Sequence, residues 1–117
     1  MFVHWGLYSV AAGQWEGKDI PGWGEWLLNK IKVDPAVYAS TLMPRFDPVK
    51  FDADAWVRAA KDAGMRYIVV TTKHHDGFCL FDSQYTNYNS TQTPAGRDLI
   101  REYVDAFRAE GLHIGFY

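Results

Sequence analysis

"RYIVVTTKHHDGF", residues 66–78, decides the fold class of this chain. Its first half is a continuous run of aromatic and β-branched residues, which is typical of a strand covered on both faces. Its second half places two histidines, a lysine and an aspartate directly after that run. We therefore expect a buried parallel strand that ends at a polar cluster.

A helical pattern precedes this strand. The stretch "DADAWVRAAKDAG", residues 52–64, has the composition of a helix with Asp52 or Asp54 near its N-cap. Gly64 is suited to end it, because glycine readily adopts the left-handed conformation found after many helices. A short join then leads to the strand, so residues 52–72 predict a helix followed by a strand.

A second helix and two further strands extend the pattern. Residues 98–111 predict a helix with Asp98 as its cap and Gly111 as its end. The apolar runs at 1–5, "MFVHW", and 112–117, "LHIGFY", predict the end of one strand and another short strand. Alternating strands and helices indicate βαβ units, a parallel sheet and an α/β fold class. The predicted inner face of the second helix is formed by Ile100, Tyr103, Val104 and Phe107.

The segments that follow the strands are much longer than those that precede them. One runs from Trp5 to about Pro35 and another from Lys73 to Arg97. Both are rich in Trp, Tyr, His and Gly, which argues against disorder. Loops at the carboxyl ends of parallel strands build the ligand sites of α/β folds. We expect the functional site there.

Composition excludes several classes of function. The 117 residues carry a formal net charge of -2, so nucleic acid is not an expected partner. No stretch approaches the roughly 20 apolar residues of a membrane-spanning helix. The single cysteine, Cys79, cannot form an internal disulfide and is interpreted as a small buried apolar residue. An aromatic content of 16% suits sugars, because Trp and Tyr offer flat apolar faces with a polar edge.

Three histidines fall at predicted strand ends: His4, His74 and His75. They could ligate a metal, act in acid–base chemistry, donate and accept hydrogen bonds to a polar ligand, or be structural. Adjacent residues of a strand point to opposite faces. His74 and His75 can therefore converge on one ion only if the strand has already ended before them.

Three further side chains are candidates. Glu25 and Trp26, in "GWGEWLL", combine a carboxylate that could hold sugar hydroxyls with an indole that could pack on a sugar ring. The alternative is a helix-start glutamate beside a core tryptophan. Asp76 could act as a base or nucleophile, but Asp-Gly is a common turn pair. We interpret Asp76 as a loop residue or a group that orients the histidines.

Taken together, "HWG" at 4–6, "GEW" at 24–26, "KHHDGF" at 73–78 and "GFY" at 115–117 closely resemble the α-L-fucosidases of glycoside hydrolase family 29. The resemblance runs over essentially the whole chain. It implies a (β/α)₈ barrel enzyme that removes terminal α-linked L-fucose with retention of anomeric configuration. On this basis residues 1–117 are expected to be an N-terminal fragment of the catalytic barrel, truncated at both ends and containing about the first three β/α units.

The resemblance also implies roles for individual residues. The nucleophilic aspartate and the acid/base of the family would lie beyond Tyr117, so no catalytic residue is expected here and the fragment alone should be inactive. No cofactor or metal is expected. The residues implied to line the fucose pocket are His4, Glu25, Trp26, His74, His75 and Tyr117.

The implied partner is a fucosylated oligosaccharide or glycoconjugate, and this substrate class suggests a secreted or periplasmic bacterial protein. Two other hypotheses stay open. One is a sugar-binding module that performs no hydrolysis. The other is a metal-dependent barrel hydrolase that uses His4, His74 and His75 as ligands.

Overall fold

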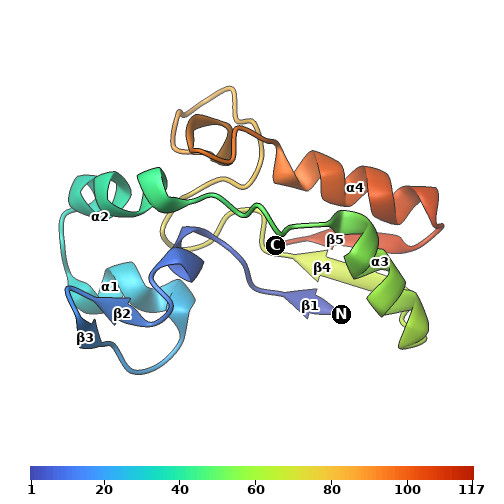
Figure 1. Ribbon diagram of the computed structural model, residues 1–117, viewed down its shortest axis with the longest axis horizontal. Helices are drawn as coiled ribbons and strands as arrows, with labels where there is room; N and C mark the ends of the chain where they lie inside the picture. Colours follow the sequence, from blue (N-terminus) through green and yellow to red (C-terminus); the bar gives the residue numbers. More distant parts are fainter.

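A parallel three-stranded sheet forms the centre of the computed structural model, which describes all of residues 1–117 (Figure 1). Its strands are β1 (Phe2–Val3), β4 (Tyr67–Val70) and β5 (His113–Phe116), in the spatial order β1-β4-β5. Both pairings are parallel. The sheet predicted from the alternating pattern is therefore confirmed, and the carboxyl ends of all three strands meet at one edge.

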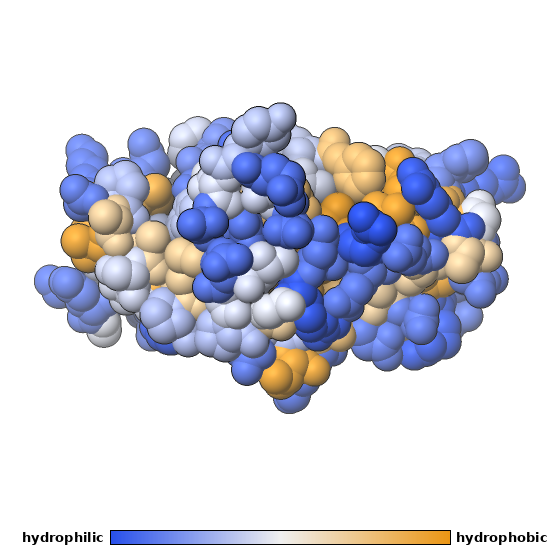
Figure 2. Space-filling view, turned by 90° about the horizontal axis from the view of Figure 1, so that it is seen from above, coloured by the Kyte–Doolittle hydropathy of each residue, from blue (hydrophilic) through white to orange (hydrophobic).

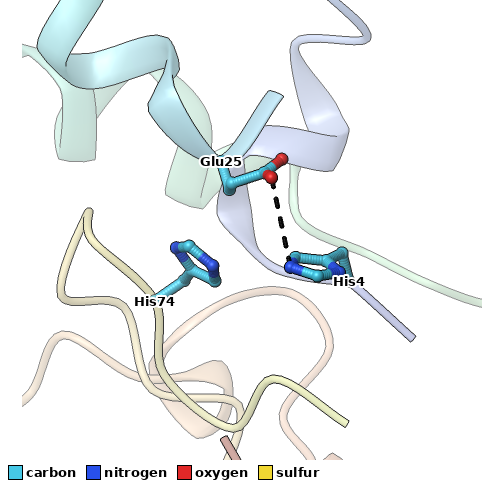
Figure 3. Close-up of side chains that lie close together, drawn as sticks. All are labelled: His4, Glu25 and His74. Atoms are coloured by element: carbon cyan, nitrogen blue, oxygen red, sulfur yellow. Dashed lines mark ion pairs between the residues drawn. The ribbon is translucent and has the colours of Figure 1, made fainter. Parts of the chain in front are cut away.

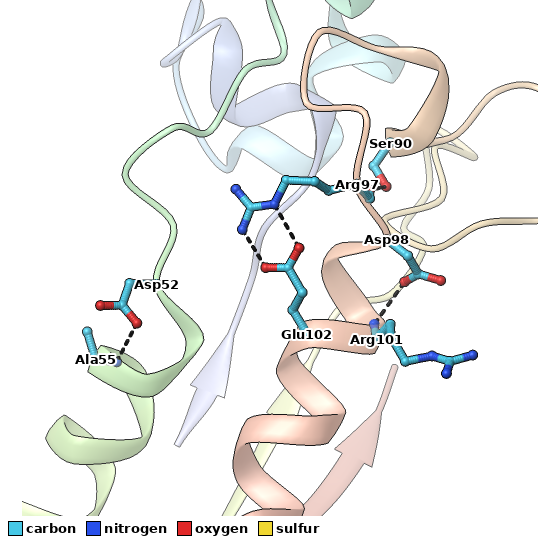
Figure 4. A network of polar contacts seen from close by, with 7 residues as sticks. All are labelled: Asp52, Ala55, Ser90, Arg97, Asp98, Arg101 and Glu102. Atoms are coloured by element: carbon cyan, nitrogen blue, oxygen red, sulfur yellow. Dashed lines mark hydrogen bonds and ion pairs between the residues drawn. The ribbon is translucent and has the colours of Figure 1, made fainter.

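The helices α3 (Ala53–Asp62) and α4 (Leu99–Ala109) begin at the predicted caps. The Asp52 carboxylate accepts a hydrogen bond from the Ala55 amide at 3.0 Å, and Asp98 accepts one from the Arg101 amide at 2.8 Å (Figure 4). These bonds satisfy amides that have no partner within the helix. Gly64 and Gly111, with φ of 69° and 70°, follow the helix ends as predicted.

Both of these helices cover the same face of the sheet, because right-handed crossovers between parallel strands place them on one side (Figure 1). Ile68 and Val70 point toward them and are buried, whereas Tyr67, on the other face, is 62% exposed. Within residues 1–117, β4 is therefore covered on one of the two faces that the sequence predicted to be covered. The Tyr103 hydroxyl of α4 donates to the Ile68 carbonyl at 2.9 Å and holds the helix on the sheet.

The first long segment contains structure that the sequence pattern did not predict. A tight turn with positive φ at Glu16 (50°) and Gly17 (75°) joins two short antiparallel strands. Two helices follow, and Asp34 caps the second by accepting from the Ala36 amide at 2.7 Å. The elements are β2 (Gln14–Trp15), β3 (Lys18–Asp19), α1 (Leu27–Ile31) and α2 (Pro35–Leu42). Short 3₁₀ helices lie at Leu7–Val10, Gly24–Trp26, Met43–Arg45 and Ser90–Gln92.

The second long segment is tied to the rest of the molecule by its own polar groups. The Ser90 hydroxyl lies 3.0 Å from the Leu80 carbonyl and 2.7 Å from the Arg97 carbonyl. The Arg97 guanidinium then bonds both carboxylate oxygens of Glu102 at the start of α4 (Figure 4). Cys79 is 2% exposed, and burial raises the pKa of its thiol, so its predicted packing role is confirmed.

One apolar core joins the loops to the sheet. Leu7, Tyr38, Phe78 and Phe107 are all almost completely buried in it. The surface seen from above is mostly hydrophilic, with smaller apolar patches between the polar side chains (Figure 2). None of the helices is long and apolar enough to cross a membrane.

Candidate functional site

Three polar side chains converge beyond the carboxyl edge of the sheet (Figure 3). His4 follows β1, His74 follows β4, and Glu25 comes from the 3₁₀ helix Gly24–Trp26. One nitrogen or oxygen atom from each of the three lies within 4.8 Å of the others, and His4 Nε2 is 4.0 Å from Glu25 Oε1. The expected gathering of polar groups at this edge is therefore observed for these three residues.

A tight turn carries the two adjacent histidines. β4 ends at Val70, so His74 and His75 are not held on opposite faces of a strand. The Gly77 amide donates to the His74 carbonyl at 2.9 Å and closes the turn, and Gly77 adopts a positive φ of 79°. The two imidazole rings lie 4.5 Å apart at 89° to each other. His74 therefore faces the cluster, while His75 packs on Trp26 with ring centroids 4.4 Å apart.

The protonation state of His74 follows from its contacts. The His75 amide donates to His74 Nδ1 at 2.9 Å, so this nitrogen is an acceptor and carries no proton. Burial and the neighbouring imidazoles of His75 and His4 lower the pKa of His74. The neutral ring then carries its proton on Nε2 and offers a donor, whereas the Glu25 carboxylate offers acceptors.

Aromatic rings lie beside the cluster. Tyr117 stacks on His74 with centroids 5.0 Å apart and an interplanar angle of 22°. Phe2 stacks on His4 at 5.0 Å. The role of Phe2 was not predicted, although its position two residues before His4 on the same strand face was a usable signal. Flat apolar rings beside polar groups are the composition expected of a site for a sugar.

A cleft of about 320 Å³ opens next to the cluster. Its size lies at the lower end of the range for small-molecule sites. Trp26 lines this cleft, and 39% of the residue is exposed. The alternative interpretation of Trp26 as a core tryptophan is therefore wrong. The residues that line the cleft are Glu25, Trp26, Leu28, Asn29, His75 and Asp76.

The histidines do not form the metal set that the sequence suggested. Glu25, and not His75, joins His4 and His74 in the cluster. Zinc bonds of about 2.0–2.2 Å place tetrahedral ligand atoms roughly 3.3–3.6 Å apart. The separation of 4.0 Å between His4 and Glu25 is wider than this. A tetrahedral ion here would require the side chains to move.

Asp76 follows the two histidines directly and lines the cleft together with His75, but its carboxylate forms hydrogen bonds with neither imidazole. Only 9% of the residue is exposed. Its carboxylate accepts hydrogen bonds from the Phe78 amide at 3.2 Å and from the Tyr38 hydroxyl at 3.3 Å. The interpretation of Asp76 as a loop residue is confirmed, and Tyr38 is a contributor to this region that the sequence did not reveal.

Comparisons with known proteins show to which family the chain belongs. The family model described as Alpha-L-fucosidase matches residues 1–117. The chain belongs to the α-L-fucosidase family. It is 34% identical over 125 residues to the tissue alpha-L-fucosidase of Bos taurus, and this match covers 100% of the chain and 26% of the bovine protein.

Solved α-L-fucosidase structures are also similar to the chain, and two of them illustrate this. A structure of a Bacteroides thetaiotaomicron GH29 enzyme with a trapped covalent intermediate is 45% identical, with a TM-score of 0.95, and the match covers 99% of this chain and 26% of that one. Isoenzyme 1 from Paenibacillus thiaminolyticus is 53% identical, with a TM-score of 0.85 and coverage of 100% and 25%. The chain therefore spans about a quarter of these relatives and has the mixed α/β fold of the corresponding segment.

Proposed function

We propose that this chain is the fucose-binding part of a retaining α-L-fucosidase, which removes terminal α-linked L-fucose from fucosylated oligosaccharides or glycoconjugates. We further propose that residues 1–117 form the N-terminal fragment, about the first three β/α units, of a (β/α)₈ barrel. The observation that carries the proposal is the convergence of His4, Glu25 and His74 at the carboxyl edge of a parallel sheet in a member of this family.

In this proposal the site binds fucose by matching donors and acceptors. Glu25 accepts hydrogen bonds from sugar hydroxyls, and the neutral His74 donates from Nε2. A buried hydroxyl left without a partner costs about 1–3 kcal/mol, so the arrangement discriminates against sugars with differently placed hydroxyls. Trp26 and Tyr117 face the apolar parts of the sugar. His4 and His75 complete the set of proposed contacts.

The chemical step requires groups besides these. Retaining hydrolysis uses two carboxyl groups about 5–5.5 Å apart, one as nucleophile and one as acid/base. Glu25 is the single carboxylate in the cluster, and the oxygens of Asp76 already accept from Tyr38 and Phe78. We therefore propose that the nucleophile and the acid/base come from strands that follow Tyr117. The covalent intermediate trapped in the Bacteroides relative supports a retaining reaction.

The proposal is tested with the protein encoded by the complete reading frame. We expect it to hydrolyse 4-nitrophenyl α-L-fucoside, and proton NMR should show α-L-fucose as the first product. Residues 1–117 alone should show no turnover. Initial release of β-L-fucose, or clear turnover by residues 1–117 alone, would contradict the proposed mechanism.

A metal-dependent hydrolase is a second candidate, favoured by the two imidazoles and one carboxylate of the cluster. Elemental analysis of the active protein separates the candidates. Stoichiometric zinc or iron, with activity lost on chelation, supports the metal enzyme, whereas full activity without metal excludes it. Fucose binding without any hydrolysis would instead support a sugar-binding module.

A further inference from the structure

The histidine turn, residues 74–77, has two different sides. His74 belongs to the polar cluster and His75 is exposed beside the cleft. Asp76, which follows them, is only 9% exposed and lies at the inner wall of the cleft with its carboxylate hydrogen-bonded to Tyr38 and Phe78. A short turn on the surface has many accessible conformations unless something holds it. Asp76 is the only buried residue of this turn, and its contacts tie the turn to the core of the molecule.

Asp76 is held from two directions. One carboxylate oxygen accepts from the Phe78 amide at 3.2 Å, which fixes the end of the turn. The other accepts from the Tyr38 hydroxyl of α2 at 3.3 Å. Hydrogen bonds to an ionised acceptor are stronger than those between neutral groups. The turn is thereby fastened to a helix that lies 38 residues away in the sequence.

Tyr38 is itself a rigid support. It is 0% exposed, and its ring stacks on Trp15 of the hairpin with centroids 5.8 Å apart and an interplanar angle of 15°. Its hydroxyl therefore cannot follow a movement of the turn without disturbing the core. The hairpin is therefore linked through Tyr38 and Asp76 to the backbone of the turn that carries the two histidines.

We infer that Asp76, anchored by Tyr38, is a positioning residue that fixes the orientation of His74 and His75 relative to Glu25. The geometry also gives the reason for a carboxylate at this place. Each of its two oxygens meets a separate donor, whereas an asparagine has one acceptor oxygen for the Phe78 amide and can only donate to the Tyr38 hydroxyl, so the bond from Tyr38 to a charged acceptor is lost. The kinetic consequence of this inference rests on the proposed function.

The test uses the complete protein and three variants, Tyr38→Phe, Asp76→Asn and the double variant. One hydrogen bond to a charged group corresponds to a change of at least about tenfold in an equilibrium constant. Each single substitution is therefore expected to raise KM for 4-nitrophenyl α-L-fucoside about tenfold, with kcat changed by less than about threefold. The double variant should be no worse than the poorer single variant, because both changes remove the same contact.

Two further measurements separate positioning from loss of stability. Asp52→Ala removes the α3 cap at a distance from the site, so it should lower Tm and leave KM unchanged. Nitrogen-15 NMR should show His74 in the Nε2–H form in the unchanged protein and in a mixture of tautomers in the variants.

The two readouts decide the inference together. KM within twofold of the unchanged protein, a tautomer spectrum that does not change, or a double variant whose effect is the product of the single effects would each overturn it. If the unchanged protein does not hydrolyse the fucoside at all, the proposed function fails, and the tautomer spectrum alone decides whether Asp76 positions the histidines.

Discussion

Replacing Glu25 with glutamine tests whether its carboxylate binds the sugar. The side chain is 17% exposed and lies 4.0 Å from His4 Nε2, so it is largely shielded from solvent without having a close hydrogen-bond partner of its own. Glu25→Gln keeps the shape of the side chain but exchanges a charged acceptor for a neutral one. The cluster should therefore stay folded while its binding to hydroxyl donors weakens.

The size of the loss follows from the number of hydrogen bonds. Bonds to a charged group contribute about 1.5–3 kcal/mol and neutral bonds about 0.5–1.5 kcal/mol, so each bond should lose about 1–1.5 kcal/mol. If Glu25 holds two hydroxyls, kcat/KM should fall roughly 30- to 150-fold. Steady-state hydrolysis of 4-nitrophenyl α-L-fucoside by the complete protein gives the value.

Glu110→Gln is the matched control, because Glu110 is an exposed residue that pairs with Lys61. Surface ion pairs contribute little, so its kcat/KM should stay close to that of the unchanged protein. A Glu25→Gln protein within threefold of the unchanged one would refute the sugar-binding role. Equal losses in both variants would mean that the effect is not specific to the site.

Three further predictions concern stability of the complete protein. Tyr103→Phe removes the hydroxyl that donates to the Ile68 carbonyl at 2.9 Å, so urea denaturation should show a loss of about 1–2 kcal/mol; an unchanged midpoint would contradict this. Asp98→Ala removes the α4 cap and should cost about 1 kcal/mol, seen as a lower Tm. Burial and neighbouring imidazoles lower the pKa of His74 below 6.5, so the unfolded chain takes up this proton first as pH falls. The free energy of unfolding should therefore decrease as pH falls from 6.5 to the folded pKa, and this slope should be smaller in His74→Gln.

The sequence predicted the features that depend on neighbouring residues. Asp52 and Asp98 cap their helices because a cap needs only the amides two or three positions further on. Gly64 and Gly111 end them because the required backbone angle is a local property. The parallel sheet followed from the order of strands and helices, and that order also placed His4 and His74 at one edge.

Features that depend on distant contacts were not predicted. Helix α2 begins at an Asp-Pro pair that indicates a helix start, but its importance comes from Tyr38, whose partner Asp76 is 38 residues away. The continuous apolar run of β4 indicated burial on both faces, but it could not show which face α3 and α4 cover within residues 1–117.

The same limit applied to the composition of the polar cluster. Sequence spacing could not show that Glu25, and not His75, joins His4 and His74, because this depends on how the first long segment folds back. His75 instead packs on Trp26.

A crystal structure of the complete protein with L-fucose, collected with anomalous data, tests the central claim most directly. The account predicts one sugar bound at the carboxyl edge of the sheet, with its hydroxyls in hydrogen-bond contact with His4, Glu25 and His74 and no anomalous peak between them. A sugar bound elsewhere, or a metal ion held by these three side chains, would contradict it.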